Sequence, residues 1–496
     1  MKQLLNWIGG GNIYGKLILL IGVLLLFPLF VIPFYPDETG YILSFAVPAL
    51  ASIGIGVVVC LFRRRPHDSL HVWQSSMQQG SLPVLFAWCY GIAAGAVPFV
   101  IGGQMGVVHA LFESVSGWTT TGLTVADVTK LPQIFLFHRS FMQYCGGLGF
   151  IMMILLLVGG KQAASLFNAE GHPDRLMPNI KKTSQTIFLL YNGFLVIGTV
   201  LYVIFGMSVF DAICHTMSAL STAGFTTQAN SIASYASFPI EAITILLMLI
   251  GSTNFAALLL LAKLKLKKLW RISELRFMIG MLVLFTPLVG FSLMGEGMGF
   301  WESMHQSLFG LVTTFTTTGY STMNYAAWPQ FAVGILILLM IIGGSVGSTA
   351  GGIKLSRTYL LLRITWINMK KRLSPTRSVR AENYYRFQGK TPIDHSVVID
   401  IFGFTVCYML VLIVGTLLVT LTEGCTVFDA MFEFTSALGT VGISNGLTNP
   451  GTNAATLFIE MAGMLLGRLE ITIVFVGIYT GIAKAKHALS GKRKKV

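Results

Sequence analysis

Four short strings in this chain combine a glycine with hydroxyl residues inside otherwise apolar sequence: "TTTGLT" around Gly122, "STAGFT" around Gly224, "TTTGYS" around Gly319 and "GTVGIS" around Gly442. Glycine reaches backbone conformations that are closed to other residues, so successive carbonyl oxygens can point the same way. A ring of such carbonyls can replace the hydration shell of a monovalent cation, and a T-V-G string is typical of that chemistry. The strings therefore indicate four parts of one cation-binding ring.

The hydroxyl residues recur at matched distances from the glycine. Each glycine has a hydroxyl residue two positions before it, two positions after it and six positions before it. The glycines are 102, 95 and 123 residues apart (224 − 122, 319 − 224, 442 − 319). Any one string also fits an ordinary turn or a small-residue packing site. Four copies with matched hydroxyls favour an internal repeat of about a hundred residues.

Each string follows an amphipathic stretch of about a dozen residues, which is too short to cross a bilayer because crossing takes about 20 residues. These stretches are predicted to be re-entrant half-helices at 107–118, 209–220, 300–312 and 427–438. Apolar runs that are predicted to span the membrane flank them at 82–101 and 134–158, 186–205 and 240–261, 277–294 and 331–342, and 397–421 and 454–482. The repeat is thus a span, a half-helix, a polar loop and a second span. Irregular backbone at membrane depth must be buried in protein or line a water-filled path, so the four loops should face one axis.

The composition indicates a polytopic membrane protein. Hydrophobic residues make up 54% of the chain and charged residues 11%, against about 25% charged in a soluble domain. The ten-residue alternation of a membrane barrel is absent, so the fold class is all-α. Two further apolar runs, 17–34 and 41–62, precede the repeats and predict an N-terminal pair of spans. The first of them is expected to be a retained anchor and not a cleaved signal peptide.

These patterns predict five segments along the chain. They are the N-terminal pair of helices at 1–70, pore repeat 1 at 71–180, pore repeat 2 at 181–268, pore repeat 3 with its cytoplasmic linker at 269–394, and pore repeat 4 with a basic tail at 395–496.

The net charge of +14 is carried by basic clusters between spans, at 63–65, 161–182, 263–276, 354–380 and 484–495. All of them can lie on one side, which the positive-inside rule makes the cytoplasm, together with both termini. Nucleic-acid binding is not expected, because the clusters are short loops without a basic domain. The six cysteines lie mostly in apolar runs and show no C-x-x-C spacing, so neither a metal site nor a disulfide framework is indicated.

Two features interrupt the apolar spans of the last two repeats. The string "GGSVGSTAGG" at 343–352 breaks a span with five glycines, each costing about 1 kcal/mol relative to alanine inside a helix. The string does not match the motif of a phosphate-binding loop. Two interpretations of the segment remain: a flexible intramembrane loop, or a simple kink in a helix. Arg468 lies inside the run 454–482, where a charge must face protein or water. Glu470, two residues on, points to another side of a helix, so it is not expected to neutralise Arg468. Two roles for Arg468 remain: a charge that lines the ion path, or one member of an Arg–Glu pair that connects helices.

With "GGSVGSTAGGIK" in the third repeat and "GMLLGRLEI" at 463–471, the chain resembles the Trk/Ktr/HKT superfamily of cation transporters, and within it the bacterial TrkH-like potassium uptake subunits. The resemblance covers nearly the whole chain. It implies potassium uptake across the bacterial inner membrane, with an intramembrane loop and Arg468 as gate. Members that pass sodium often replace the first glycine with serine, and Gly122 keeps it.

The predicted site residues fall into two sets. The filter set comprises Thr120, Thr121, Gly122, Leu123, Thr222, Ala223, Gly224, Phe225, Thr317, Thr318, Gly319, Tyr320, Thr440, Val441, Gly442 and Ile443. The gate set comprises Gly343, Gly344, Gly347, Ser348, Thr349, Gly351, Gly352 and Arg468.

Several functional questions stay open in the sequence. A proton- or sodium-coupled potassium symporter on the same fold is the alternative, with Glu470 and His215 as candidate carriers. Glu113 and Glu433 stand nine residues before the ring glycine. Three roles are open to them: capping the half-helix, tuning the charge of the outer vestibule, or holding the half-helix through a plain hydrogen bond. No motif supports an enzyme.

The resemblance also implies partners. It predicts a homodimer, a surrounding of membrane lipid and a cytosolic nucleotide-binding regulatory subunit, TrkA-like, that contacts the linker 356–394 or the Lys-rich tail. This chain is expected to hold no cofactor of its own: potassium is its substrate, and any nucleotide belongs to the partner.

Overall fold

The structure is a computed structural model that describes residues 12–61, 76–149, 152–153, 180–373, 383–386 and 389–493. The described chain is almost entirely helical, with one antiparallel hairpin of β1 (Asn383–Arg386) and β2 (Gly389–Pro392). The predicted basic cluster at 63–65, residues 161–179 of the predicted cluster 161–182, and residues 154–158 of the predicted span 134–158 lie outside the described residues. Part of the predicted linker 356–394 is regular structure, because the hairpin and a long helix before it occupy most of it.

The N-terminal pair consists of α2 (Ile13–Leu24), η1 (Phe27–Phe34), η2 (Pro36–Tyr41) and α3 (Ile42–Leu61). Gly15 and Gly22 of α2 let the two α-helices approach closely. A side chain on Gly15 would collide with Cys60, and one on Gly22 with Ile53. Glu38 connects this pair to the first repeat, since its carboxylate accepts hydrogen bonds from the backbone N–H groups of Gln133 (2.6 Å) and Ile134 (2.8 Å).

The four predicted half-helices are present: α5 (Val107–Trp118), α10 (Val209–Leu220), α15 (Phe300–Phe315) and α19 (Val427–Leu438). Their N-terminal residues Val107, Val209 and Val427 are 55–60% exposed, whereas their last turns are buried. Ser208 and Thr426 begin two of them by accepting hydrogen bonds from backbone N–H groups three residues on. Each half-helix therefore runs from the surface into the centre of the protein.

Further helices surround the half-helices. The first span of each repeat is α4 (Ser76–Ile101), α9 (Ile180–Ile204), α14 (Ser273–Met294) or α18 (His395–Glu423). The second is α6 (Gln133–Leu148), α11 (Phe238–Gly251) with α12 (Phe255–Ala262), α16 (Gln330–Ile342) with α17 (Leu355–Leu373), or α20 (Ala454–Arg468) with α21 (Ile471–Arg493). The short elements α13 (Leu266–Leu269), η3 (Ser231–Tyr235) and η4 (Tyr325–Ala327) lie in connections.

Two runs that hydropathy predicts as continuous are broken. The run 240–261 bends by 118° between α11 and α12, and the run 454–482 bends by 100° between α20 and α21. Asn254 begins the new helix in the first case, because its side chain accepts a hydrogen bond from Ala256 N–H. In the second case Glu470 adopts a left-handed conformation (φ 61°), which no right-handed helix tolerates. Hydropathy averages over such breaks because they leave the composition apolar.

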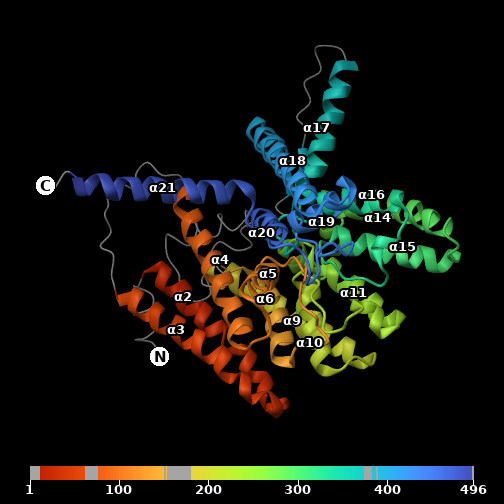
Figure 1. The fold of residues 1–496 in the computed structure, drawn as a ribbon. Helices are drawn as coiled ribbons and strands as arrows, with labels where there is room; N and C mark the ends of the chain where they lie inside the picture. Colours follow the sequence, from red (N-terminus) through yellow and green to blue (C-terminus); the bar gives the residue numbers. More distant parts are fainter. Residues whose placement is uncertain are drawn as a thin grey trace.

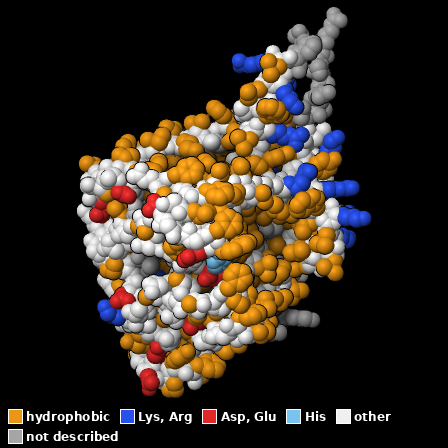
Figure 2. Space-filling view, turned by 90° about the vertical axis from the view of Figure 1, so that its right-hand side faces the viewer, with side chains coloured by type: hydrophobic (Ala, Val, Ile, Leu, Met, Phe, Trp, Pro, Cys, Tyr) orange, Lys and Arg blue, Asp and Glu red, His pale blue; other side chains and the backbone are white. Residues whose placement is uncertain are grey.

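Within the described chain, six helices are long and apolar enough to cross a membrane, or eight if each bent pair counts as one span. Figure 1 shows the half-helices α5 and α19 near the middle and α15 reaching toward the right-hand edge, while α21 and the pair α17 and α18 project outward. Figure 2 shows a broad band of hydrophobic side chains, with most Lys and Arg along one edge and most Asp and Glu toward the opposite one. This surface suits a lipid bilayer bounded by two aqueous sides.

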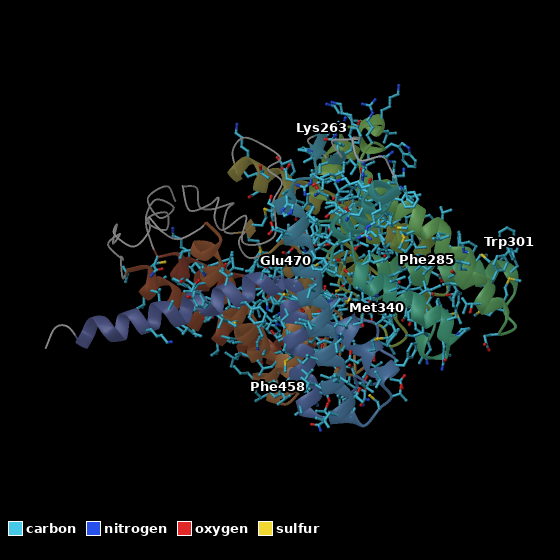
Figure 3. The ribbon with its side chains drawn as sticks, turned by 90° about the horizontal axis from the view of Figure 1, so that it is seen from above. Lys263, Phe285, Trp301, Met340, Phe458 and Glu470 are labelled. Atoms are coloured by element: carbon cyan, nitrogen blue, oxygen red, sulfur yellow. The ribbon has the colours of Figure 1, made fainter. Side chains whose placement is uncertain are left out.

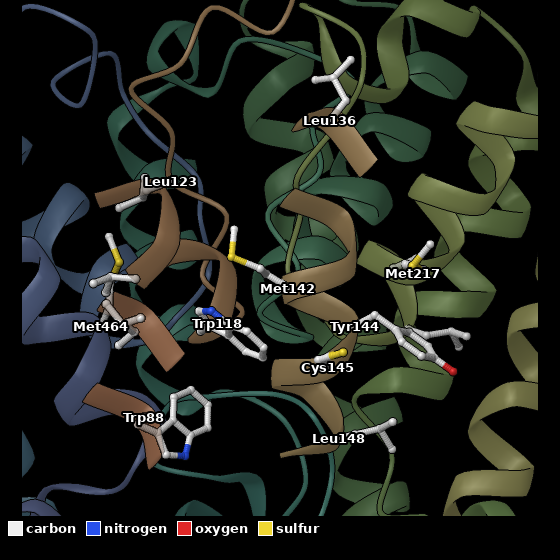
Figure 4. Close-up of a cluster of buried hydrophobic side chains, with 14 of the residues drawn as sticks. Trp88, Trp118, Leu123, Leu136, Met142, Tyr144, Cys145, Leu148, Met217 and Met464 are labelled. Carbon is white, nitrogen blue, oxygen red and sulfur yellow. The ribbon is translucent and has the colours of Figure 1, made fainter. Parts of the chain in front are cut away.

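The core lies between the repeats. Figure 4 shows Trp118 of α5, Met142 and Tyr144 of α6, and Met217 of α10 in one buried cluster. Seen from above in Figure 3, Met340 of α16 lies in the interior, whereas Trp301, which is 82% exposed, lies at the periphery. The packed interior therefore surrounds the loops that follow the half-helices.

Candidate functional site

The four loops share one backbone conformation. The threonine two residues before each ring glycine is left-handed, with φ between 51° and 56° at Thr120, Thr222, Thr317 and Thr440. The glycines themselves have φ between 78° and 96°. A left-handed conformation costs about 1–2 kcal/mol in a residue other than glycine, so the surrounding structure must hold each threonine. The repetition of this cost in all four copies indicates that the loop geometry is required.

A matching hydrogen bond holds every loop to its half-helix. The residue before the glycine donates its backbone N–H to the carbonyl five residues earlier, as in Thr121 to Ser116 (2.9 Å), Ala223 to Ser218 (3.0 Å), Thr318 to Thr313 (2.9 Å) and Val441 to Ser436 (2.8 Å). In the first and last repeats the hydroxyls of Ser116 and Ser436 also accept the glycine N–H at 3.0 Å. The hydroxyl position six residues before the glycine thus supports the loop from behind.

The loops close into a ring. A side chain on any ring glycine would collide with the carbonyl oxygen of the residue before the glycine in the next repeat. The four pairs are Gly122 with Ala223, Gly224 with Thr318, Gly319 with Val441, and Gly442 with Thr121. Because the last pair returns to the first repeat, segments from all four repeats form one closed circle of carbonyl groups. Glycine is required at these positions both for its conformation and for the close approach.

The residues after the glycines pack away from the ring. Leu123, Phe225, Tyr320 and Ile443 are all buried. The Tyr320 hydroxyl donates to the His215 carbonyl (2.9 Å), and the Arg139 guanidinium lies 3.9 Å from the centre of the Phe225 ring. The structure therefore brings all sixteen predicted filter residues together, with side chains of the last position of each set serving as packing.

The Gly-rich segment forms a loop beneath the ring. Gly343, Gly347 and Gly352 have φ between 69° and 77°, which ends α16 and reverses the chain. The loop is anchored to the break in the second repeat, because Ser345 N–H donates to Ser252 O (3.0 Å) and Thr349 N–H to Gly251 O (3.3 Å). The alternative of a simple helix kink is therefore wrong: the segment is an ordered loop between two helices.

This loop reaches the threonines of the ring. Gly351 N–H donates to the Thr317 hydroxyl (2.8 Å), and the hydroxyls of Thr349 and Thr222 are 3.1 Å apart. The hydroxyls of Thr120 and Thr440 have no hydrogen-bond partner among the residues that the structure describes. The inner end of the ring is thus hydrogen bonded to the loop on two of its four sides.

Arg468 joins this loop to the first repeat. One guanidinium nitrogen donates to the Thr349 carbonyl, and the other donates to Gly146 O (2.6 Å) and Gly147 O (3.3 Å). The Lys354 ammonium turns back to the Ala350 carbonyl. A cavity of about 40 Å³ lies beside these two cations. Lys354, which lies at the start of a basic cluster in the sequence, is therefore part of the loop's own network.

Glu470 has a different partner from the one that sequence proximity offers. Its carboxylate pairs with the Arg357 guanidinium (2.9 Å), and that guanidinium lies 4.0 Å from the centre of the Phe404 ring on α18. The prediction that Glu470 does not neutralise Arg468 is consistent with these contacts. Arg357, in the first turn of α17, was missed, because in the sequence it is one member of the basic cluster 354–380 and nothing distinguishes it from its neighbours.

The carboxylates nine residues before the ring glycine hold the outer loops. Glu113 forms a buried ion pair with Arg139 (2.9 Å) and accepts hydrogen bonds from Thr124 Oγ1 (2.6 Å) and Val125 N–H (2.7 Å). Glu433 accepts hydrogen bonds from Asn445 N–H (3.1 Å) and from the Thr448 hydroxyl. Of the roles left open, these contacts favour a hydrogen-bonding one, in which each carboxylate connects its half-helix to the loop that follows the ring glycine. The sequence did not lead us to predict a role for Arg139. A charged residue inside the apolar run 134–158 would have indicated one, because charges in membrane spans usually have a partner or a function.

The whole chain is similar to known transport proteins. The family of cation transport proteins described as TrkH matches residues 57–480. The Trk system potassium uptake protein TrkH of Vibrio parahaemolyticus is 31% identical over 486 residues, covering 94% of this chain and 97% of that protein. The protein of the same name from Escherichia coli strain K12 is 30% identical over 485 residues, with the same coverage.

A solved structure agrees with the sequence matches. The crystal structure of the potassium transporter TrkH from Vibrio parahaemolyticus has a TM-score of 0.81 at 29% identity, covering 96% of this chain and 98% of that one. Family match, identity and structural likeness all extend over nearly the full length. This chain belongs to the TrkH family of cation transport proteins, and it is therefore a multi-pass membrane transport protein and not an enzyme.

Proposed function

We propose that this protein takes up potassium across the bacterial inner membrane by passing the ion through the closed ring of four loops. The observation that carries the proposal is the contact of each ring glycine with the preceding carbonyl of the next repeat. Such a circle presents oxygens from four directions, which compensates a monovalent cation for its lost water. Glycine in all four copies and the names of the similar proteins, which are a potassium uptake protein and a potassium transporter, support potassium as the substrate.

In this proposal the loop 343–352 and Arg468 form the gate. The loop lies against the inner end of the ring through Gly351 and Thr349. Arg468 holds the loop through the Thr349 carbonyl, and it adds a positive charge beneath the path, which opposes a cation. Opening requires these hydrogen bonds to break, so conduction and loop position are linked.

The test is rubidium flux into proteoliposomes that hold the purified protein, compared with sodium flux. We expect rubidium to permeate better than sodium, and Gly442→Ser to lower that preference, because a side chain there meets Thr121 O. Gly334→Ser on α16, where nothing lies within 4 Å, is the matched control. Equal permeation of rubidium and sodium through the unmodified protein would overturn the selectivity.

The alternative is a proton- or sodium-coupled symporter, and both residues that could carry the coupling ion have hydrogen-bond or ion-pair partners in the structure. Glu470 is paired with Arg357, and His215 is buried with its Nδ1 at 2.9 Å from the Asp211 carbonyl. These contacts favour structural roles for both residues. A potassium current that reverses at the potassium equilibrium potential under every pH and sodium gradient is the expected result, and a dependence on either gradient supports coupling.

We also propose an orientation and partners. The basic edge in Figure 2 supports a cytoplasmic location for that side, and we propose that both termini lie there too. The end of α17 with Lys370, Lys371 and Arg372, and the hairpin 383–392, offer a surface for a cytosolic nucleotide-binding regulatory subunit, and the chain is proposed to form a homodimer in the lipid bilayer. Nucleotide then binds to the partner, and this chain carries no cofactor of its own. Flux that does not respond to an added soluble subunit contradicts the partner proposal.

A further inference from the structure

The side chain of Gln143, on α6 of the first repeat, contacts the ring loop of the second repeat. Its Nε2 donates a 2.7 Å hydrogen bond to the Ala223 carbonyl. Its Oε1 accepts hydrogen bonds from the Ser218 hydroxyl (2.6 Å) and from Phe225 N–H (3.2 Å). A backbone N–H can only donate, so the bond from Phe225 assigns the oxygen end of the amide. Gln143 is fully buried, and all three of these hydrogen bonds go to the ring loop of the second repeat or to the end of the half-helix before it.

The Ala223 carbonyl differs in this respect from its three counterparts in the ring. The carbonyls of Thr121, Thr318 and Val441 accept no hydrogen bond from any residue that the structure describes. Gln143 is the eleventh residue of α6, and the eleventh residues of α11, α16 and α20 are Met248, Met340 and Met464, none of which has a side-chain donor. The ring is therefore chemically unequal: one carbonyl in four is shared with a side-chain amide.

Gln143 also replaces a support found elsewhere. In the first and last repeats the serine six residues before the glycine accepts the glycine N–H directly. In the second repeat the corresponding Ser218 donates to Gln143 instead. Gln143 thus connects both ends of the loop, at Ser218 and Phe225, to the carbonyl between them.

The hydrogen bond from Gln143 limits the movement of the Ala223 carbonyl but still allows that carbonyl to bind a cation. A carbonyl oxygen has two lone pairs, so a hydrogen bond from Gln143 leaves one for a cation. The bond resists rotation of the Ala223 peptide, and in a buried site such a bond is stronger than in water. Discrimination between cations of different radius depends on how far the coordinating oxygens can move and on their field strength.

We propose that Gln143 is a positioning residue for ion selection, which holds the Ala223 carbonyl in the ring at a fixed orientation. The inference rests on the proposed function of the ring as the cation path. It means that a side chain of the first repeat holds the ring loop of the second repeat, whereas in the first and last repeats a serine of the same repeat's own half-helix holds the loop.

The first test is Gln143→Leu in proteoliposomes, measured as the ratio of rubidium to sodium flux. Leucine keeps the volume but removes the donor and the acceptor. We expect the ratio to fall about fivefold, the size of one lost buried hydrogen bond, while rubidium flux persists. Met340→Leu, at the corresponding buried position of the third repeat, should leave the ratio unchanged.

Gln143→Glu gives a second test, because a purely structural role of Gln143 predicts no dependence of the flux ratio on pH in this variant. Glutamate keeps acceptors for Ser218 and Phe225, but its other oxygen then faces the Ala223 oxygen. When that carboxyl is ionised, the two acceptors repel each other. When it is protonated, it donates to Ala223 and restores the bond. The ratio should therefore recover as the pH falls.

The unmodified protein measured at each pH is the control, because its other titratable groups near this site are unchanged. They are Arg139 on α6, Glu113 on α5, and Cys214 and His215 on α10.

The outcomes separate the inference from the proposed function. If Gly442→Ser lowers the ratio while Gln143→Leu and Gln143→Glu keep it at every pH, the inference is overturned and the ring remains the path. If the unmodified protein passes both ions equally, both proposals fail. A lowered ratio in Gln143→Leu with recovery of Gln143→Glu at low pH supports the inference, and size-exclusion elution like that of the unmodified protein shows that both variants fold.

Discussion

The backbone N–H of Gly351 donates a 2.8 Å hydrogen bond to the hydroxyl of Thr317, which connects the intramembrane loop to the inner end of the third ring loop. On the neighbouring side, the hydroxyls of Thr349 and Thr222 are 3.1 Å apart. Under the proposed function of the ring, an oxygen that is hydrogen bonded to the loop is less available to a cation, so we expect loop docking and cation occupancy of this end of the ring to oppose each other.

Alanine at any ring glycine should strongly reduce rubidium flux. At Gly122, Gly224, Gly319 and Gly442 the added Cβ meets a carbonyl of the next repeat, and the positive φ adds strain. We expect rubidium flux to fall by at least about tenfold for each variant, given about 1–2 kcal/mol of strain before the collision is counted.

The control for this series is Gly206→Ala. Gly206 has φ +97° but nothing within 4 Å of an added Cβ, so it carries the strain without the collision. Retained flux in Gly206→Ala together with loss in the four ring variants assigns the effect to the ring. Normal flux in any ring variant contradicts the closed circle.

Gly351→Ala should favour the open gate. An added Cβ there would collide with the Thr440 hydroxyl and the Gly439 carbonyl, so the loop cannot stay docked. Loss of the Thr317 hydrogen bond alone corresponds to about 1 kcal/mol, or about fivefold in the ratio of open to closed protein. Rubidium flux without a cytosolic partner should rise, and reduced flux with intact folding would show that the loop is needed for conduction instead.

Arg468→Gln should raise basal flux more than Gly351→Ala does. The guanidinium donates to Thr349 O and Gly146 O, and hydrogen bonds from charged groups contribute about 1.5–3 kcal/mol. Arg468→Lys keeps the charge but presents it as a single point, so it should give an intermediate flux. Comparison of the unmodified protein with these two variants in flux recordings separates the charge from the bonding geometry, and equal basal flux in all three contradicts the gate assignment.

The Glu113–Arg139 pair should matter for stability. Both side chains are 0–1% exposed, and removal of one member of a buried pair costs about 3–5 kcal/mol because the other charge is left without a partner. Arg139→Met should lower the thermal unfolding temperature in detergent strongly, and Glu113→Gln with Arg139→Met should recover part of it.

The control for this pair is the exposed one between Lys130 and Asp127. The Lys130 side chain is 82% exposed, so Lys130→Ala should leave the unfolding temperature unchanged. A double variant that is no more stable than Arg139→Met alone would mean that the pair is not the source of the effect.

The sequence alone predicted much of this protein. Three of the half-helices, at 107–118, 209–220 and 427–438, have the bounds that amphipathic patterning indicated, and the fourth extends to Phe315 instead of residue 312. Hydropathy found the spans, and alignment of the strings found the four ring glycines. These features repeat along the chain, and a repeat is visible without knowledge of contacts.

Only the tertiary structure decided how the parts meet. The order in which each glycine contacts the next repeat, the pairing of Glu470 with Arg357, and the breaks within 240–261 and 454–482 all depend on segments far apart in sequence. Gln143 is the clearest case. As a single polar residue in an apolar run it carries no pattern, and its role appears only when folding places its amide beside the Ala223 carbonyl, because a hydrogen bond depends on distance and direction in space.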